Sequence, residues 1–180
     1  MGRDLHLFCE TMAPNGSFQA LSDGEFYVPR SHELLRALGV GPVGDDSACV
    51  IRARGIPFNV SQEVSSRFYV PVVDTERAKT WQIGEHFSPE AARELVCAGL
   101  SAWIPEAQTR PLVPSSGGYI SHPDWHGGHW LTLTEFRDAL RHAEFAFTTS
   151  PWEIRSLLCY LEAVESTSGR MVRLVFWFDN

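Results

Sequence analysis

The sequence has 180 residues, of which 44% are hydrophobic and 21% are charged. This length and composition are typical of a single folded domain with a buried core, and they argue against disorder. The formal net charge is −7 at pH 7 with the histidines neutral. A surface of this sign repels phosphate backbones and anionic lipids, so we expect neither nucleic acid nor a membrane as a partner.

The four cysteines are widely separated and form no C-x-x-C pair, which predicts reduced, mostly buried thiols. No apolar leader follows Met1, and no hydrophobic run reaches the roughly 18 residues that a membrane span requires. We therefore expect a cytoplasmic protein.

The chain begins with an alternating segment, residues 3–10, which predicts a β-strand. One face of this strand carries Leu5, Leu7 and Cys9. The other face carries Asp4, His6, Phe8 and Glu10. Two interpretations of the polar face remain open, because a half-exposed antiparallel strand alternates in the same way as a strand that presents polar groups to a binding site.

Helices are predicted where capping residues precede apolar residues at helical spacing. These segments are 31–38, 88–99, 132–143 and 151–165. Residues 64–118 include the second of these helices and a long irregular stretch, 104–118. We expect this region to form a loop or an inserted subregion of the single domain, since long irregular loops in compact domains tend to be functional or disordered.

Arg52 and Arg54 lie just before Gly55 in a segment with the character of a turn. Two guanidinium groups beside a glycine are suited to bind a carboxylate or a phosphate. The alternative is that both arginines only form ion pairs with acidic groups at the surface.

A histidine-rich loop, residues 119–131, precedes the third predicted helix. Its potential metal ligands are His122, Asp124, His126 and His129. Pro123 and the pair Gly127 and Gly128 exclude a regular helix there, so any shared ligand would be bound by a loop. Three interpretations remain open: a metal site, a site for a small ligand or for catalysis, and an aromatic corner whose polar groups bind the backbone before the helix.

The last apolar run, residues 171–178, has the length of a strand and predicts a central strand buried on both faces. Asp179 follows it directly, and ligands often bind at the ends of central strands. Together these segments predict an α+β or α/β domain with one mixed β-sheet. Its first and last strands are expected to be central, and about four helices to flank it.

Five pieces of the chain are similar to a group of uncharacterised bacteriophage and prophage proteins. These pieces are MGRDLHLFCE, PRSHELLRALG, ARGIPFNVS, DWHGGHWLTLTEF and VRLVFWFDN. The sequence departs from the group at Asn59, where an acid is expected, and at Gly128 and His129, which replace a His-Ser pair. The resemblance implies a viral accessory protein in the host cytoplasm, with a role against host defence. Such a protein would bind a host protein, or would sequester or degrade a nucleotide signal.

Three hypotheses for function follow from these residues. The first is a binding protein for a small polar or nucleotide-like ligand, with a pocket formed by Asp4, His6, Arg54, His126, His129 and Asp179. The second is a hydrolase that uses a divalent metal as its cofactor. Its metal ligands would be His122, Asp124 and His126, with His6 as a further candidate and Asp4 or Glu10 as the base.

The third hypothesis is an inhibitor that docks on a host protein. Residues 104–118 and exposed tryptophans would supply the contacts, because aromatic anchors are common in protein interfaces. The sequence alone leaves open whether the protein is an enzyme.

Overall fold

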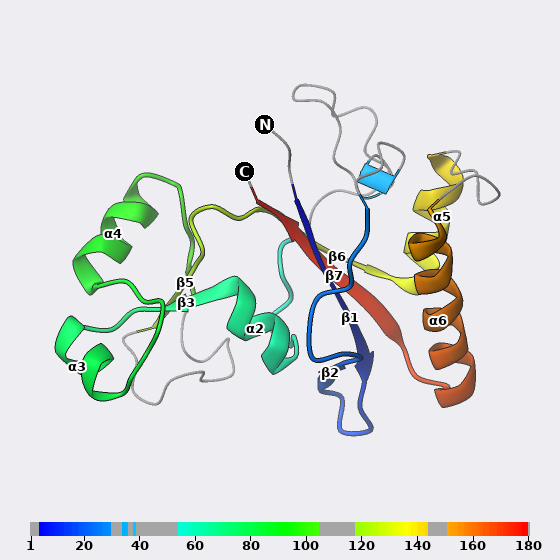
Figure 1. Ribbon diagram of the computed structural model, residues 1–180, viewed down its shortest axis with the longest axis horizontal. Coiled ribbons are helices and arrows are strands. Elements are labelled where there is room, and N and C mark those ends of the chain that lie inside the picture. Colours follow the sequence, from blue (N-terminus) through cyan, green and yellow to red (C-terminus); the bar gives the residue numbers. More distant parts are fainter. Residues whose placement is uncertain are drawn as a thin grey trace.

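The main sheet has its first and last strands at the centre, as Figure 1 shows for the computed structural model. The structure describes residues 4–29, 34, 35, 38, 54–104, 118–143 and 151–179. The main sheet has the strand order β2-β1-β7-β6, and every neighbouring pair is antiparallel. Its strands are β1 (Leu5–Met12), β2 (Phe18–Ala20), β6 (His126–Thr132) and β7 (Val172–Phe178). The predicted α+β fold with central first and last strands is confirmed, and the strand pairings within this sheet are antiparallel rather than mixed.

The register of β1 on β7 sorts the side chains of both strands between the two faces of the sheet. Leu7 is opposite Phe176 on one face, and His6 is opposite Trp177 on the other. Because successive residues of a strand point to opposite faces, the alternation read from residues 3–10 is preserved in the folded sheet.

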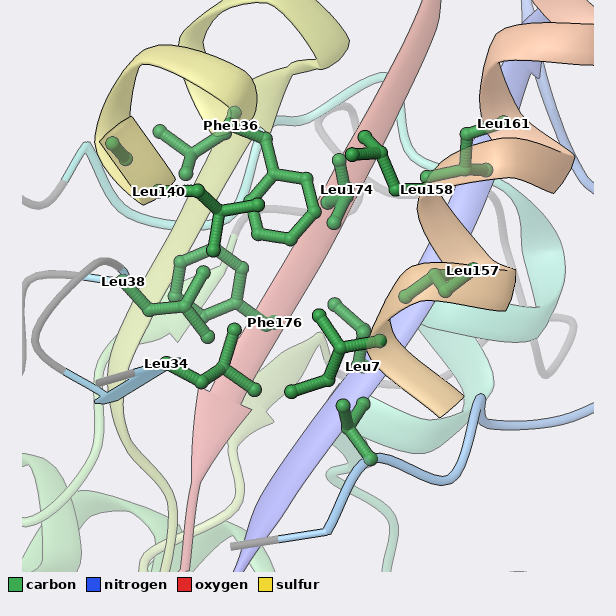
Figure 2. Close-up of a cluster of buried hydrophobic side chains, with 14 of the residues drawn as sticks. Leu7, Leu34, Leu38, Phe136, Leu140, Leu157, Leu158, Leu161, Leu174 and Phe176 are labelled. Atoms are coloured by element: carbon green, nitrogen blue, oxygen red, sulfur yellow. The ribbon is translucent and has the colours of Figure 1, made fainter. Parts of the chain in front are cut away.

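Two helices cover the face that carries Leu7 and Phe176, which we call the helix side. They are α5 (Leu133–His142) and α6 (Trp152–Ser168). Figure 2 shows their leucines and Phe136 pointing at β1 and β7. The labelled side chains of this core are Leu7, Leu34, Leu38, Phe136, Leu140, Leu157, Leu158, Leu161, Leu174 and Phe176. Leu34 and Leu38 belong to the predicted helix 31–38, of which residues 31–33, 36 and 37 lie outside the described part of the chain.

The start of α5 follows from its sequence. The hydroxyl of Thr132 accepts a hydrogen bond from the amide of Glu135, and the Glu135 carboxylate accepts one from the amide of Thr132. This reciprocal capping box satisfies two backbone donors that would otherwise lack a partner. Helix α6 ends at Gly169, whose positive φ of 64° is a conformation that glycine adopts without strain.

A shorter helix and a second sheet cover the opposite face of the main sheet, which we call the polar side. Helix α2 (Gln62–Phe68) packs there, and it leads into a three-stranded antiparallel sheet of order β3-β5-β4. These strands are β3 (Tyr69–Pro71), β4 (Trp103–Ile104) and β5 (Tyr119–Ser121). Figure 1 shows this sheet beside helices α3 (Thr75–Thr80) and α4 (Pro89–Cys97), on the far side of α2 from α5 and α6.

The sequence predicted α4 but neither α2 nor α3. Helix α4 packs on the second sheet through Ala92, so it does not flank the main sheet as expected. Helices α2 and α3 have only seven and six residues, and such short helices depend on caps and tertiary contacts rather than on a long apolar repeat. Ser61 and Asp74 cap them through their side chains. The irregular loop 104–118 lies almost entirely outside the described residues.

Within the described residues, no helix is both long and apolar enough to cross a bilayer. Three cysteines are described, all of them free thiols: Cys9 is buried, whereas Cys97 and Cys159 are exposed. The expectation of mostly buried thiols is therefore met at Cys9 alone among these three.

Candidate functional site

The two ends of the described chain meet at one end of the main sheet. The amide of Asp4 donates to Oδ1 of Asp179 at 2.8 Å, and the amide of Asp179 donates to the carbonyl oxygen of Asp4 at 3.2 Å. Figure 1 shows the start of β1 and the end of β7 side by side at this end of the sheet. The first and last strands, both predicted at the centre of the sheet, are therefore direct neighbours.

His6 lies between two carboxylates at this end of the sheet. Its Nδ1 is 2.9 Å from Oε2 of Glu25, and its Nε2 is 3.5 Å from Oδ2 of Asp179. The side chain of His6 is only 14% exposed, and its ring stacks on Trp125 with 4.7 Å between the ring centroids. Nδ1 is hydrogen-bonded to Glu25, whereas Nε2 is only in contact with the Asp179 carboxylate and makes no hydrogen bond among the described residues.

The groups around His6 carry a surplus of negative charge. Glu25 accepts a hydrogen bond from Nε of Arg67 at 2.9 Å, and the Arg67 guanidinium lies 6.0 Å from the centre of the Trp125 ring. We call this group the sheet-end cluster. Its members are Asp4, His6, Glu25, Arg67, Trp125 and Asp179. The two carboxylates that contact His6, against one guanidinium, favour ligands that present hydrogen-bond donors or positive charge.

Arg54 and His129 form a separate group at the edge strand β6. Nδ1 of His129 accepts hydrogen bonds from the amide of Trp130 at 2.8 Å and from the amide of Arg54 at 3.3 Å. Nδ1 is therefore an acceptor, and the proton of a neutral ring is on Nε2. The Arg54 guanidinium binds the carboxylate of Glu135 and lies 4.9 Å from the centre of the Trp130 ring.

Arg54 thereby joins the cap of α5 to the chain before α2. Its hydrogen bond to Glu135 lowers the pKa of that carboxyl to about 2, assisted by the hydrogen bonds from Thr132. The carboxylate of Glu135 already occupies the Arg54 guanidinium. A free phosphate or carboxylate would have to displace it in order to bind there.

The six residues predicted to line one ligand pocket fall into different places. Asp4, His6 and Asp179 come together, and Arg54 and His129 come together elsewhere. His6 shares the polar side with Trp177, but the ring of His129 lies 5.4 Å from that of Phe176 on the helix side. The rings of His6 and His129 thus lie on opposite faces of the sheet. Arg54 lies at the edge strand β6, where it contacts Trp130 and His129, so the geometry offers two sites instead of the single predicted one.

His126 also stands apart from the sheet-end cluster. It pairs with Phe178 across β6 and β7, and the two ring centroids are 6.1 Å apart. Both ring nitrogens are buried, and neither has a hydrogen-bond partner among the described residues. A β-bulge between His126 and His129 shifts the register there, so the spacing in sequence gave no guide to the face on which each ring lies.

The three predicted metal ligands do not converge. Nε2 of His122 is 3.0 Å from Oε1 of Glu85, and its Nδ1 accepts from the amide of Asp124 at 3.2 Å. His126 lies beside Phe178 instead of joining this pair. Over the described ranges, no three histidine, cysteine or acidic side chains are placed to hold a metal ion. His122 and Asp124 belong to a turn, in which the imidazole satisfies a backbone amide.

Sequence reasoning missed a buried ion pair on the polar side. Arg173 of β7 donates through Nε to Oε2 of Glu10 at 2.7 Å, and both side chains are almost completely buried. Arg173 also donates to the side chain of Asn59 at 2.9 Å and to its carbonyl oxygen at 3.1 Å. Glu10 accepts in addition from the amide of Ser61, the N-cap of α2.

This ion pair attaches the start of α2 to the sheet. All three guanidinium nitrogens of Arg173 and both carboxylate oxygens of Glu10 have a hydrogen-bond partner. Burial lowers the pKa of Arg173, and the neighbouring Glu10 carboxylate opposes that shift. The signal available in the sequence was an arginine within the most apolar run of the chain, together with an acid on the polar face of the first strand. Glu10 was considered only as a catalytic base, a role that its buried pairing with Arg173 does not favour.

No protein family, curated protein or solved structure matches this chain.

Proposed function

We propose that this chain is a phage-encoded accessory protein that binds a small polar ligand at the sheet-end cluster. The observation that carries the proposal is the contact of His6 with both Glu25 and Asp179, at the point where the chain ends meet. A histidine held between carboxylates, with an aromatic ring stacked on it, is a polar group fixed in place before any ligand arrives. The resemblance to phage proteins supplies the proposed setting, which is a role against host defence in the host cytoplasm.

A nucleotide-like ligand matches the chemistry of this cluster. The carboxylate of Asp179 can accept hydrogen bonds from the amino groups of a base. The indole of Trp125 offers an aromatic surface, and Arg67, whose side chain is 57% exposed, can bind a phosphate. The surplus of carboxylates favours a ligand with few phosphates, since each added negative charge is repelled.

Calorimetric titration with a panel of nucleosides, monophosphates and cyclic dinucleotides tests this proposal. We expect one class to bind, and the substitution His6→Gln or Asp179→Asn to weaken that binding at least tenfold. Arg93→Gln serves as a matched control, because Arg93 is an exposed arginine on α4 that pairs only loosely with Glu90, at 3.8 Å. If every ligand bound equally well to the His6 variant and to the unmodified protein, the cluster would not be the binding site.

Docking on a host protein is the second candidate function, and exposed aromatic side chains favour it. Trp152 is 65% exposed on α6, and Trp81 and Trp103 are 43% and 39% exposed elsewhere on the surface. Large exposed aromatic groups are enriched in protein interfaces, where they act as anchors. Affinity capture from host lysate with the unmodified protein and with Trp152→Ser tests this candidate. A specific partner retained equally by both proteins would exclude Trp152 as an anchor.

A further inference from the structure

Helix α6 and the segment after β2 enclose an aromatic groove, which we call the α6 groove. Its volume is about 370 Å³. The residues that line it are Phe26, Tyr27, Trp152, Glu153, Ser156, Leu157 and Tyr160. Pockets that bind small ligands start at about 300 Å³, so this one has room for a small organic group or a single side chain.

The groove arises from an unusual distribution of residues along α6. Trp152, Ser156 and Tyr160 recur at intervals of four, so they lie on one face of the helix. Ile154 and Leu161 are fully buried in the main core. The exposed face therefore carries large rings where soluble helices usually carry charged groups.

Three rings of the groove are open to solvent. Tyr27 is 79% exposed, Trp152 is 65% exposed and Tyr160 is 42% exposed. Phe26 packs behind them, with its ring centroid 6.0 Å from that of Tyr160. Exposing so much aromatic surface in one place is unfavourable in water, and contiguous exposed patches of this kind usually mark a binding site.

We propose that the α6 groove binds an alkylated ammonium group, such as a methylated lysine side chain of a partner protein. The faces of aromatic rings carry partial negative charge and attract cations, and groups of several rings are how proteins bind quaternary ammonium ions. Four of the seven lining residues are aromatic. Glu153 is the one charged side chain among the lining residues that the structure describes, and it is negative.

The mostly aromatic lining of the groove favours cations that have few N–H donors. A guanidinium or a primary ammonium group brings several N–H donors that favour water over an aromatic surface, and a primary ammonium group is strongly hydrated. Among the described lining side chains, only the Glu153 carboxylate and the hydroxyls of Tyr27, Ser156 and Tyr160 can accept. A methylated ammonium group carries the positive charge with few or no donors, so it suits a groove that is mostly aromatic.

Charge also distinguishes this occupant from a second copy of the chain. The protein has a formal net charge of −7, so two copies repel each other as they approach. A cationic partner is attracted by the same charge.

This inference deepens the second candidate function, because it names the chemical group that would dock at Trp152. The two can fail separately. Binding of a small cation to the purified protein needs no host partner, whereas docking on a host protein could use other exposed tryptophans.

Choline and its neutral carbon isostere, 3,3-dimethylbutan-1-ol, provide the test, because they share shape and differ in charge. Titration into the 180-residue protein, followed by calorimetry and by the NMR shift of the Trp152 indole N–H, measures binding of each. We expect choline to bind roughly five- to thirtyfold more tightly than the isostere. This ratio corresponds to an attraction of about 1–2 kcal/mol between the cation and the aromatic rings. Equal affinities would show an apolar groove without cation selectivity and would overturn the proposal.

Two variants and a control locate the binding. Trp152→Leu keeps an apolar side chain but removes the ring. We expect it to weaken choline binding at least fivefold and to leave the affinity for the isostere unchanged. Glu153→Gln should weaken choline binding by a smaller factor that disappears at high salt. Trp81→Leu removes the tryptophan that follows α3, which is 43% exposed, and should have no effect on choline binding. Choline binding that survives Trp152→Leu unchanged, or an absence of choline binding, would refute the assignment.

Discussion

The two faces of the main sheet are formed by the same central strands, yet they are stabilised in different ways. On the helix side, Leu7, Leu174 and Phe176 pack against leucines of α5 and α6 in an apolar core. On the polar side, Glu10 and Arg173 form a buried ion pair beneath aromatic rings. The helix side depends on volume and packing, whereas the polar side combines an apolar cluster around Phe8 and Trp177 with partners for each buried charge.

This difference explains why the sheet-end cluster lies on the polar side. A face that must hold polar groups in fixed positions can extend them to the surface, as β1 does from Glu10 in the interior to His6 and Asp4 at the end of the sheet. The helix side does not carry such a series. Its two histidines, His126 and His129, lie on the edge strand instead of the centre of the sheet.

The largest effect on stability is expected from breaking the buried ion pair. Arg173→Met leaves the Glu10 carboxylate buried without its partner and should reduce the free energy of unfolding by about 3–5 kcal/mol. The double variant Glu10→Leu with Arg173→Met should recover most of that loss, because no charge remains buried. Urea denaturation of both variants measures this. A double variant as unstable as the single one would show that Asn59 and Ser61 depend on the charges themselves.

The matching change on the helix side is Leu174→Ala. Leu174 is completely buried among side chains of the core. Its truncation should reduce the free energy of unfolding by about 2–5 kcal/mol, because contacts are lost and a cavity remains. In contrast to the ion pair, no second substitution of a charged residue should rescue it. Urea denaturation under the same conditions provides the measurement, and a loss below about 1 kcal/mol would mean that the surrounding leucines collapse into the space.

Acid should destabilise the protein through Glu135, at the boundary between the two faces. The pKa of Glu135 is lowered to about 2 in the folded protein from an ordinary value of 4.5, chiefly by its hydrogen bond to Arg54. The unfolded chain therefore binds the proton more readily. The contribution of Glu135 to stability is complete above about pH 4.5 and is lost as the pH falls toward 2.

Glu135→Gln tests this, because glutamine preserves the capping box but does not titrate. The melting temperature of the unmodified protein should fall more steeply between pH 5 and pH 2 than that of the variant. Parallel curves for the two proteins would contradict the assignment.

The smallest effect is expected at the exposed end of the polar side. Arg67→Gln removes the ion pair with Glu25. Because the Arg67 side chain is 57% exposed, the free energy of unfolding should fall by only about 0–1 kcal/mol. The same substitution should weaken binding of a phosphate-bearing ligand while leaving a nucleoside unaffected. Thermal unfolding with and without ligand separates the two roles of this arginine.

Several features of the fold were accessible from the sequence because local rules govern them. The alternation of Leu7 with His6 determined which side chain faces the core, since a strand has a period of two. The motif from Thr132 to Glu135 predicted the start of α5, because the capping box is a contact between neighbours in the chain. The apolar run before Asp179 predicted a central strand, because a continuous apolar segment of strand length is buried on both faces.

The candidate site was accessible only in part. Asp4, His6 and Asp179 were correctly expected to lie together, because the first and last strands are neighbours. Glu25 and Arg67 were missed, since one lies in a loop and the other on a seven-residue helix, without a local pattern that points to His6. The position of His129 on the helix side depended on a β-bulge that no spacing reveals.

By itself the sequence determined the α+β class, the central place of both terminal strands, and the caps that begin α4 and α5, whereas α6 begins at Pro151 without a side-chain cap. These features depend on the order of apolar and polar residues within a few positions of one another. Tertiary structure alone decided which charges meet across the sheet, as in the pairing of Glu10 with Arg173, residues separated by most of the chain. Such partners are selected by the register of strands and by the exclusion of water, and neither is a property of any single segment.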